Sequence, residues 1–123
     1  MNGFYMEEIE NILNYPPDLE DSQIPKEVFD VIYSLGRDAE NEEEYVYAYG
    51  ILLELCKRKS RHVRAYSILA MSLMARSGVL QREDLVPIIE NEWNRNDMDE
   101  WSRNTIRSAV DDFNLFLGWN IKV

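Results

Sequence analysis

Two side chains of this sequence carry groups that support nucleophilic or acid–base chemistry. Cys56 is the only cysteine, and His62, six residues further on, is the only histidine. A thiol beside an imidazole becomes a nucleophile when a third group orients the imidazole, and no such group stands at a recognisable spacing. Cys56 also falls on the apolar stripe of its segment, with Tyr49 and Leu52. We expect Cys56 to be a buried, inert thiol and His62 to be solvated or to cap a helix.

The sequence predicts no cofactor or metal site. Its glycines stand singly, so no glycine-rich phosphate loop is present. Histidine and cysteine do not cluster, and Asp97-Met-Asp-Glu100 lacks the glycine and the downstream glutamate of a calcium loop. Helix capping explains Asp97 and Glu100 without an ion. We therefore expect no catalytic residue, no small-molecule substrate and no enzymatic activity.

The charges are sorted along the chain, which has a formal net charge of −10 on 123 residues. From Leu55 to Arg82 there is no acidic residue but there are seven basic ones: Lys57, Arg58, Lys59, Arg61, Arg64, Arg76 and Arg82. Acidic residues dominate elsewhere, and a field of that sign attracts basic partners and repels nucleic acid. For the basic segment we expect a helix terminus paired with nearby carboxylates; contact with nucleic acid is the alternative.

The composition predicts one folded domain over residues 1–123. Hydrophobic residues make up 46% of the chain, enough to build a core at this length. The first residues lack the basic and apolar regions of a signal peptide, and the longest apolar run, about 45–55, is too short to span a bilayer. We expect no membrane contact and a reducing compartment, most simply the cytoplasm.

Helical periodicity runs through the chain, and no segment alternates at period two. The expected helices cover about residues 5–14, 25–36, 41–56, 60–76, 83–93 and 97–117. Asn41 with Glu44, and Asp97 with Glu100, have the spacing of capping boxes. Gly36 is expected to end its helix in a left-handed conformation.

Two of these helices invite predictions about position in the fold. The third is apolar nearly all round, which predicts that it lies at the centre. The fourth is expected to end at Gly78 and to carry Arg64 and Ser72 on the side away from its core stripe. Because the connecting loops are short, neighbouring helices should pack as antiparallel hairpins.

Two helix starts resemble each other: His62-Val-Arg-Ala-Tyr-Ser-Ile-Leu and Trp101-Ser-Arg-Asn-Thr-Ile-Arg-Ser. Arg64 and Arg103 are then 39 residues apart, close to the roughly 40-residue period of HEAT repeats. Asp84-Leu-Val-Pro-Ile-Ile looks like the second helix of such a repeat. Residues 42–119 therefore resemble a HEAT- or armadillo-like helical-repeat domain. The resemblance implies an all-α, right-handed stack of about six helices in antiparallel hairpins.

A small, acidic, all-helical chain also resembles the immunity proteins of bacterial contact-dependent growth inhibition and related polymorphic toxin systems. That resemblance implies a non-catalytic protein that binds one basic toxin domain, such as a nuclease, and covers its active site. The alternative is a small helical-repeat adaptor in a regulatory assembly; an enzyme is a distant third.

A binding surface for a basic partner is expected at the acidic helix starts. In a right-handed hairpin stack, Glu42–Glu44 and Glu83–Asp84 would share one edge, with Asp97–Glu100 on the opposite edge beside Ser60 and Arg61. The expected contact carboxylates are Glu42, Glu43, Glu44, Glu83, Asp84, Asp97, Asp99 and Glu100. A second set of expected contacts comprises Tyr47 and one flank of the last helix, formed by Trp101, Asp112 and Leu115.

Overall fold

The computed structural model describes residues 6–76 and 82–123, and these residues form helices without any β-strand. The helices are α1 (Met6–Asn14), α2 (Lys26–Arg37), α3 (Glu42–Leu55), α4 (Arg61–Ala75), α5 (Leu85–Trp93) and α6 (Glu100–Leu117), with a short 3₁₀ turn η1 (Asp21–Gln23) before α2. The predicted all-α fold is confirmed. None of the helices in the described ranges combines the length and apolarity that a bilayer crossing requires.

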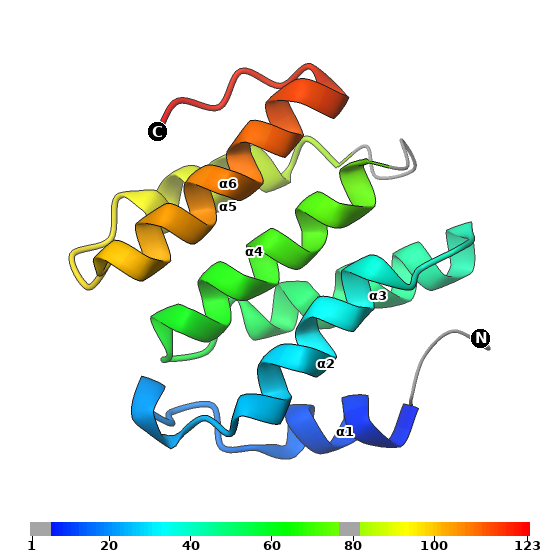
Figure 1. Ribbon diagram of the computed structural model, residues 1–123, viewed down its shortest axis with the longest axis vertical. Helices are drawn as coiled ribbons and strands as arrows, with labels where there is room; N and C mark the ends of the chain where they lie inside the picture. The colour runs from blue at the N-terminus through cyan, green and yellow to red at the C-terminus, as the bar shows by residue number, and fades with distance from the viewer. Residues whose placement is uncertain (1–5, 77–81) are drawn as a thin grey trace.

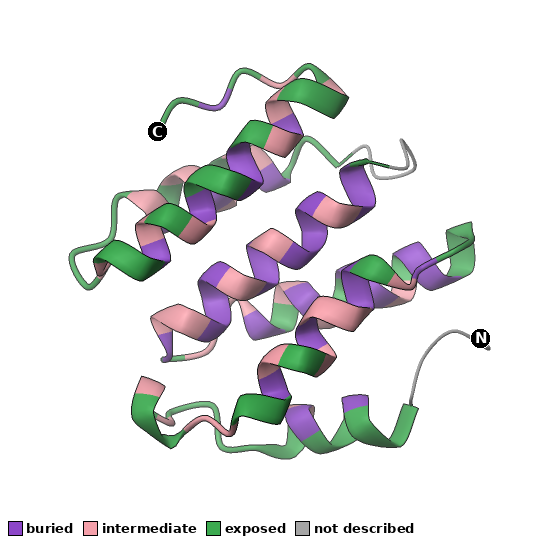
Figure 2. Ribbon diagram, in the orientation of Figure 1, coloured by how far each residue is buried: buried purple, intermediate pink, exposed green. Residues whose placement is uncertain are grey.

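Three helices lie side by side in one layer, and two cover them from behind. Figure 1 shows α2, α4 and α6 running alongside one another, α3 and α5 behind them, and α1 across one end. Helix α4 contacts α2, α3 and α6. The prediction that the third helix is central is therefore wrong, because α3 leaves Val46 63% exposed while Ile68 and Met71 of α4 are fully buried. Figure 2 shows this contrast along the ribbons.

Close packing of α2 on α4 depends on a glycine. Helix α2 continues through Gly36 to Arg37, and its C-cap Asp38 is right-handed, so the predicted left-handed end at Gly36 is wrong. A Cβ atom on Gly36 would lie 1.9 Å from the carbonyl oxygen of Ala70. The missing side chain therefore lets the two helix backbones approach each other.

The helix starts follow the predicted capping chemistry with one shift. The Asn41 side chain accepts a hydrogen bond from the Glu44 N–H at 2.9 Å, as expected. For α6 the capping residue is Asp99, which accepts from the Ser102 N–H at 2.8 Å, and the prediction of Asp97 is wrong.

The last helices end as their sequences allow. Gly118 has a φ of 68° and ends α6 in the left-handed region. Helix α4 ends at Ala75, and Gly78, the predicted end, lies outside the described residues.

Candidate functional site

The basic segment is paired within the protein. Lys57 lies 3.2 Å from Glu54, Lys59 2.6 Å from Glu20, Arg76 2.8 Å from Asp112 and Arg82 3.2 Å from Asp84. Arg58 instead donates to the backbone carbonyl oxygens of Leu13 and Tyr15, at 2.9 and 2.6 Å. The first carbonyl belongs to the last turn of α1 and the second follows that helix directly, at a terminus where a cation is favoured. The expected pairing with nearby carboxylates is confirmed for Lys57, Lys59, Arg76 and Arg82, whereas Arg58 binds backbone carbonyls.

Arg64 forms the buried part of this network. Its side chain is 2% exposed, so the prediction that it lies away from the core is wrong, as it is for the fully buried Ser72. The Arg64 Nε donates to Glu92 of α5 at 2.8 Å, and one terminal nitrogen donates to Asp97 at 2.9 Å. The other donates to the carbonyl oxygens of Arg58 and Lys59. A buried guanidinium is tolerated because partners of this kind surround it.

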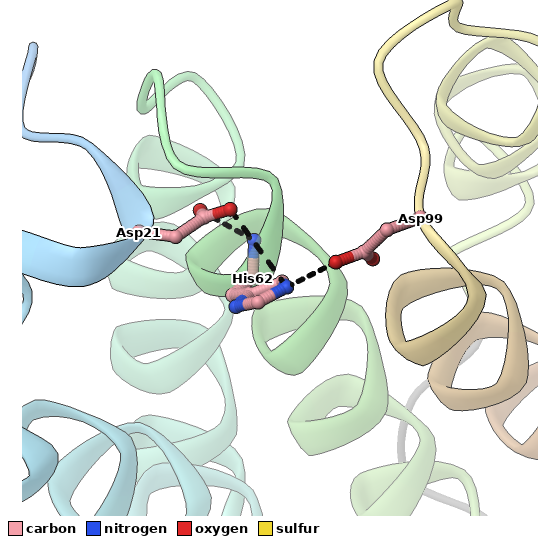
Figure 3. A group of neighbouring side chains, drawn as sticks. All are labelled: Asp21, His62 and Asp99. Carbon is pink, nitrogen blue, oxygen red and sulfur yellow. Dashed lines mark hydrogen bonds and ion pairs between the residues drawn. The ribbon is translucent and has the colours of Figure 1, made fainter.

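His62 sits between two aspartates that come from opposite ends of the sequence. Its Nε2 lies 2.7 Å from Asp99 Oδ2 and 3.8 Å from Asp21 Oδ2. Figure 3 shows Asp21 approaching from η1, His62 at the start of α4, and Asp99 just before α6. The His62 side chain is 27% exposed and contacts both aspartates. We call Asp21, His62 and Asp99 the junction; His62 is part of it and is not the solvated or capping side chain that we predicted.

The junction lowers the pKa values of its carboxyl groups. Partial burial would raise the pKa of Asp99, but hydrogen bonds from His62 and Ser102 outweigh burial and hold it well below its usual range. Burial is outweighed likewise at Asp21, whose pKa is lowered by hydrogen bonds from Ser60 and Arg61. The ionised carboxylates therefore help to hold η1, α4 and α6 together.

The same three residues have the geometry of a metal-ligand set. One ligand atom each from Asp21, His62 and Asp99 lie within 4.8 Å of one another, and such nitrogen and oxygen donors suit divalent transition metals. However, Arg61 Nε lies 2.9 Å from Asp21 Oδ2 and 3.5 Å from Asp99 Oδ2, so a guanidinium already supplies positive charge there. We interpret the group as a structural junction, and the absence of a metal site stays a prediction.

The junction is poorly arranged for nucleophilic catalysis. The nearby hydroxyl of Ser60 donates to Asp21 Oδ1 at 2.6 Å and accepts from the Val63 N–H. Neither of these hydrogen bonds is made with His62, which therefore does not activate the hydroxyl. Cys56 is partly exposed as a residue, but its thiol is buried. Burial of the thiol, assisted by the Glu92 carboxylate, raises its pKa to about 12. The thiolate, which is the reactive form, is therefore scarce at neutral pH.

An aromatic surface adjoins the junction. Trp101 is 42% exposed, and its ring lies 4.5 Å from the His62 ring, 6.1 Å from Tyr66 and 6.5 Å from Phe29, measured between centroids. The rings therefore connect α2, α4 and α6 on one face. This surface includes Trp101, which the sequence had singled out, and adds Phe29 and Tyr66, which it had not.

The other predicted aromatic and apolar contacts differ in their surroundings, and their role in binding stays a prediction. Asp112 pairs with Arg76, whereas Leu115 is 75% exposed. Tyr47 on α3 is half-buried, and burial together with the Glu10 charge raises its pKa.

Four of the eight carboxylates predicted to contact a partner already bind groups within the protein. Glu44 is 3% exposed and accepts from the Glu40 N–H. Asp84 accepts from the Tyr49 hydroxyl and from Arg82, Asp97 pairs with Arg64 and Arg95, and Asp99 binds His62. The others, Glu42, Glu43, Glu83 and Glu100, are exposed.

The two predicted acidic edges have different outcomes. Arg61 donates to the Asp97 carbonyl oxygen at 2.7 Å, so the acidic stretch that begins there lies beside the basic turn as expected. The contact of Asp84 with Tyr49 places the start of α5 over the body of α3, several residues beyond Glu42. The proposed single rim of Glu42–Glu44 with Glu83–Asp84 stays a prediction.

A groove between α1 and α2 escaped the sequence analysis. It has a volume of about 310 Å³ and is lined by two sets of residues. They are Glu8, Asn11 and Ile12 of α1 with Tyr15 just beyond its end, and Glu27, Val28, Asp30 and Val31 of α2. The helical period places each set on one face of its helix. Only the packing of α1 against α2 brings the two faces together.

No family model matches the chain, and no curated protein or solved structure matches it.

Proposed function

We propose that the protein is a non-catalytic binding module for a basic protein partner. One observation carries the proposal: the seven cations of residues 55–82 are engaged in contacts within the protein, while many carboxylates elsewhere are exposed. Because those cations are already paired or bound, the excess of acid is left on the surface. Such a surface attracts basic proteins and disfavours nucleic acid.

The more specific form of this proposal is an immunity protein that acts in the cytoplasm. The acidic surface would speed the encounter with a basic toxin domain, and the bound protein would then cover the toxin's active site. Electrostatic steering of this kind raises association rates from about 10⁵–10⁶ M⁻¹s⁻¹ towards 10⁸–10⁹ M⁻¹s⁻¹ at low salt. The exposed carboxylates of Glu42, Glu43, Glu83 and Glu100 contribute to that field, and the Trp101 surface offers apolar contact beside it.

The second candidate is a small helical-repeat adaptor. It is favoured by the layered packing of α2, α4 and α6 over α3 and α5, which leaves one broad face for contact (Figure 1). A non-catalytic role in either case is supported by the high pKa of the Cys56 thiol and by the occupied hydrogen bonds around His62.

Co-expression with the protein encoded immediately upstream tests the immunity proposal. We expect that gene to encode a basic toxin domain, whose toxicity this protein suppresses, and we expect stopped-flow association to slow steeply as salt rises. Glu42→Lys with Glu43→Lys should slow association about tenfold and change dissociation little. Glu44 is left intact because its buried carboxylate holds the start of α3.

A matched control keeps the change in net charge the same. Glu90→Lys with Asp111→Lys also adds two lysines for two acids, on α5 and α6. We expect this control to slow association less. A non-toxic upstream product would overturn the immunity proposal and leave the adaptor; association independent of salt would contradict electrostatic capture in either role.

A further inference from the structure

The groove between α1 and α2 combines acid with apolar surface. Glu8, Glu27 and Asp30 line it, and no lysine, arginine or histidine does so. In the described part of the chain these three carboxylates make neither a hydrogen bond nor an ion pair through their side chains. They differ in this from Asp84, Asp97 and Asp99, whose carboxylates are bound by partners within the protein.

The floor of the groove is apolar. Ile12 and Val28 form its deepest part, at 5% and 4% exposed, while Val31 and Tyr15 are more open. The volume of about 310 Å³ is far larger than the ~10–15 Å³ that a cavity needs, on the same measure, to hold one water molecule. Apolar side chains of a partner can therefore enter while cationic groups beside them reach the carboxylates.

The wall formed by α1 is held in place by the basic turn that precedes α4. Arg58 binds the carbonyl oxygens of Leu13 and Tyr15, and the Lys59 N–H donates to the carbonyl oxygen of Pro17 at 2.9 Å. The end of α1 is thus fixed by the Arg58 side chain and the Lys59 backbone, and neither residue lines the groove. A groove formed in advance lowers the ordering cost of binding.

We propose that this groove docks a basic amphipathic segment of the protein partner. Aliphatic side chains of that segment pack on Ile12 and Val28, and its lysines or arginines pair with Glu8, Glu27 and Asp30. This is the helix-in-groove mode, in which apolar anchors repeat along one face of the ligand. The inference rests on the proposed function and deepens it, because it assigns the contact to α1 and α2, where no sequence prediction had placed it.

A synthetic probe tests the groove without the natural partner. The probe is a fluorescein-labelled 14-residue peptide that repeats Leu-Lys-Lys-Leu-Leu-Lys-Lys, and its binding is followed by fluorescence anisotropy at low and high salt. Glu27→Lys with Asp30→Lys should weaken binding by at least about tenfold. The control Glu90→Lys with Asp111→Lys, which has the same net charge, should weaken it by less than about threefold.

The apolar half of the proposal needs its own variants. A probe with serine at every leucine position should bind much more weakly to the wild-type protein. Val31→Ser removes apolar surface without changing charge, and we expect it to weaken the original probe by about threefold or more. Amide chemical-shift changes should concentrate on α1 and α2. Thermal midpoints of all variants confirm that each is folded.

Equal losses for the groove variant and the charge-matched control would overturn the inference, because the probe would then report only the overall field. Indifference to Val31→Ser and to the serine probe would overturn it too. In both cases the proposed function stands if the upstream toxin still binds in a salt-dependent way. Conversely, the probe could bind the groove as expected while association with the natural partner does not depend on salt. That pair of results would count against the proposed function alone.

Discussion

The junction before α4, extended through Arg64 to Glu92 and Asp97, uses acidic residues in the opposite way to the groove between α1 and α2. In the junction, Asp21, Asp97 and Asp99 each meet a cation or a histidine from another element. In the groove, Glu27 and Asp30 stand beside apolar side chains with no cation in the lining. The comparison teaches that an acidic residue count says little about function until the paired carboxylates are separated from the unpaired ones.

Burial explains why the junction needs its pairs. Arg64 is 2% exposed, and an unpaired charge at that depth would be very costly, so its partners Glu92 and Asp97 are part of the fold. The groove carboxylates remain at the surface, where water solvates them. The junction should therefore dominate stability and the groove should dominate binding.

The largest expected effect comes from breaking the buried pair. Arg64→Met leaves the Glu92 carboxylate buried without its main partner, and we expect a loss of about 3–5 kcal/mol in the free energy of unfolding. Urea denaturation measures it. Arg64→Met combined with Glu92→Leu should recover a large part of the loss, since no buried charge remains at that pair. A single variant within about 1 kcal/mol of wild type would contradict the assigned role of Arg64.

A smaller loss is expected at the exposed side of the junction. Asp99→Ala removes both the cap of α6 and the partner of His62, which should cost about 1–2 kcal/mol. Asp99→Asn keeps an oxygen for the cap and should cost less. Thermal unfolding of the two variants separates the contributions. Equal stability of Asp99→Ala and wild type would show that neither contact stabilises the fold.

Acid should weaken the junction in a defined range. The hydrogen bond from Arg95, with help from Arg64 and against partial burial, lowers the pKa of Asp97 from 3.8 to about 2. The stabilisation is therefore complete above pH 4 and is lost as pH falls towards 2. Since Asp97 is 44% exposed, we expect only about 1 kcal/mol from this group after screening. Asp97→Asn should flatten the pH dependence of urea unfolding; an unchanged slope would contradict this account.

The smallest expected effect lies in the groove. Glu27→Gln with Asp30→Asn should change the free energy of unfolding by no more than about 0.5 kcal/mol, because both side chains are exposed and unpaired. Glu27 lies in the first turn of α2, where its charge is worth a few tenths of a kcal/mol at most. Urea denaturation of this double variant and of Arg64→Met under the same conditions compares the two losses directly. A loss of 2 kcal/mol or more would show that the groove carboxylates are structural after all.

Much of the local structure could be predicted from the sequence because it depends on neighbours in the chain. The helical periods, the cap at Asn41, and the left-handed end at Gly118 arise from residues within one or two turns of each other. The predictions that failed needed information on packing. Glycine is the residue type that most often ends a helix, but Gly36 lies inside α2. A side chain at this position would collide with the Ala70 backbone of α4.

The sequence by itself determined the helices, the acidic excess and the absence of acidic residues from 55–82. Only the tertiary structure decided which charges are neutralised. His62 meets Asp99 across 37 positions and Arg64 meets Glu92 across 28, and no local pattern encodes such distances. The physical reason is that a charge pair acts through space over a few ångströms, whereas periodicity and capping act along the chain. The same reason separates the paired aspartates of the junction from the unpaired carboxylates of the groove.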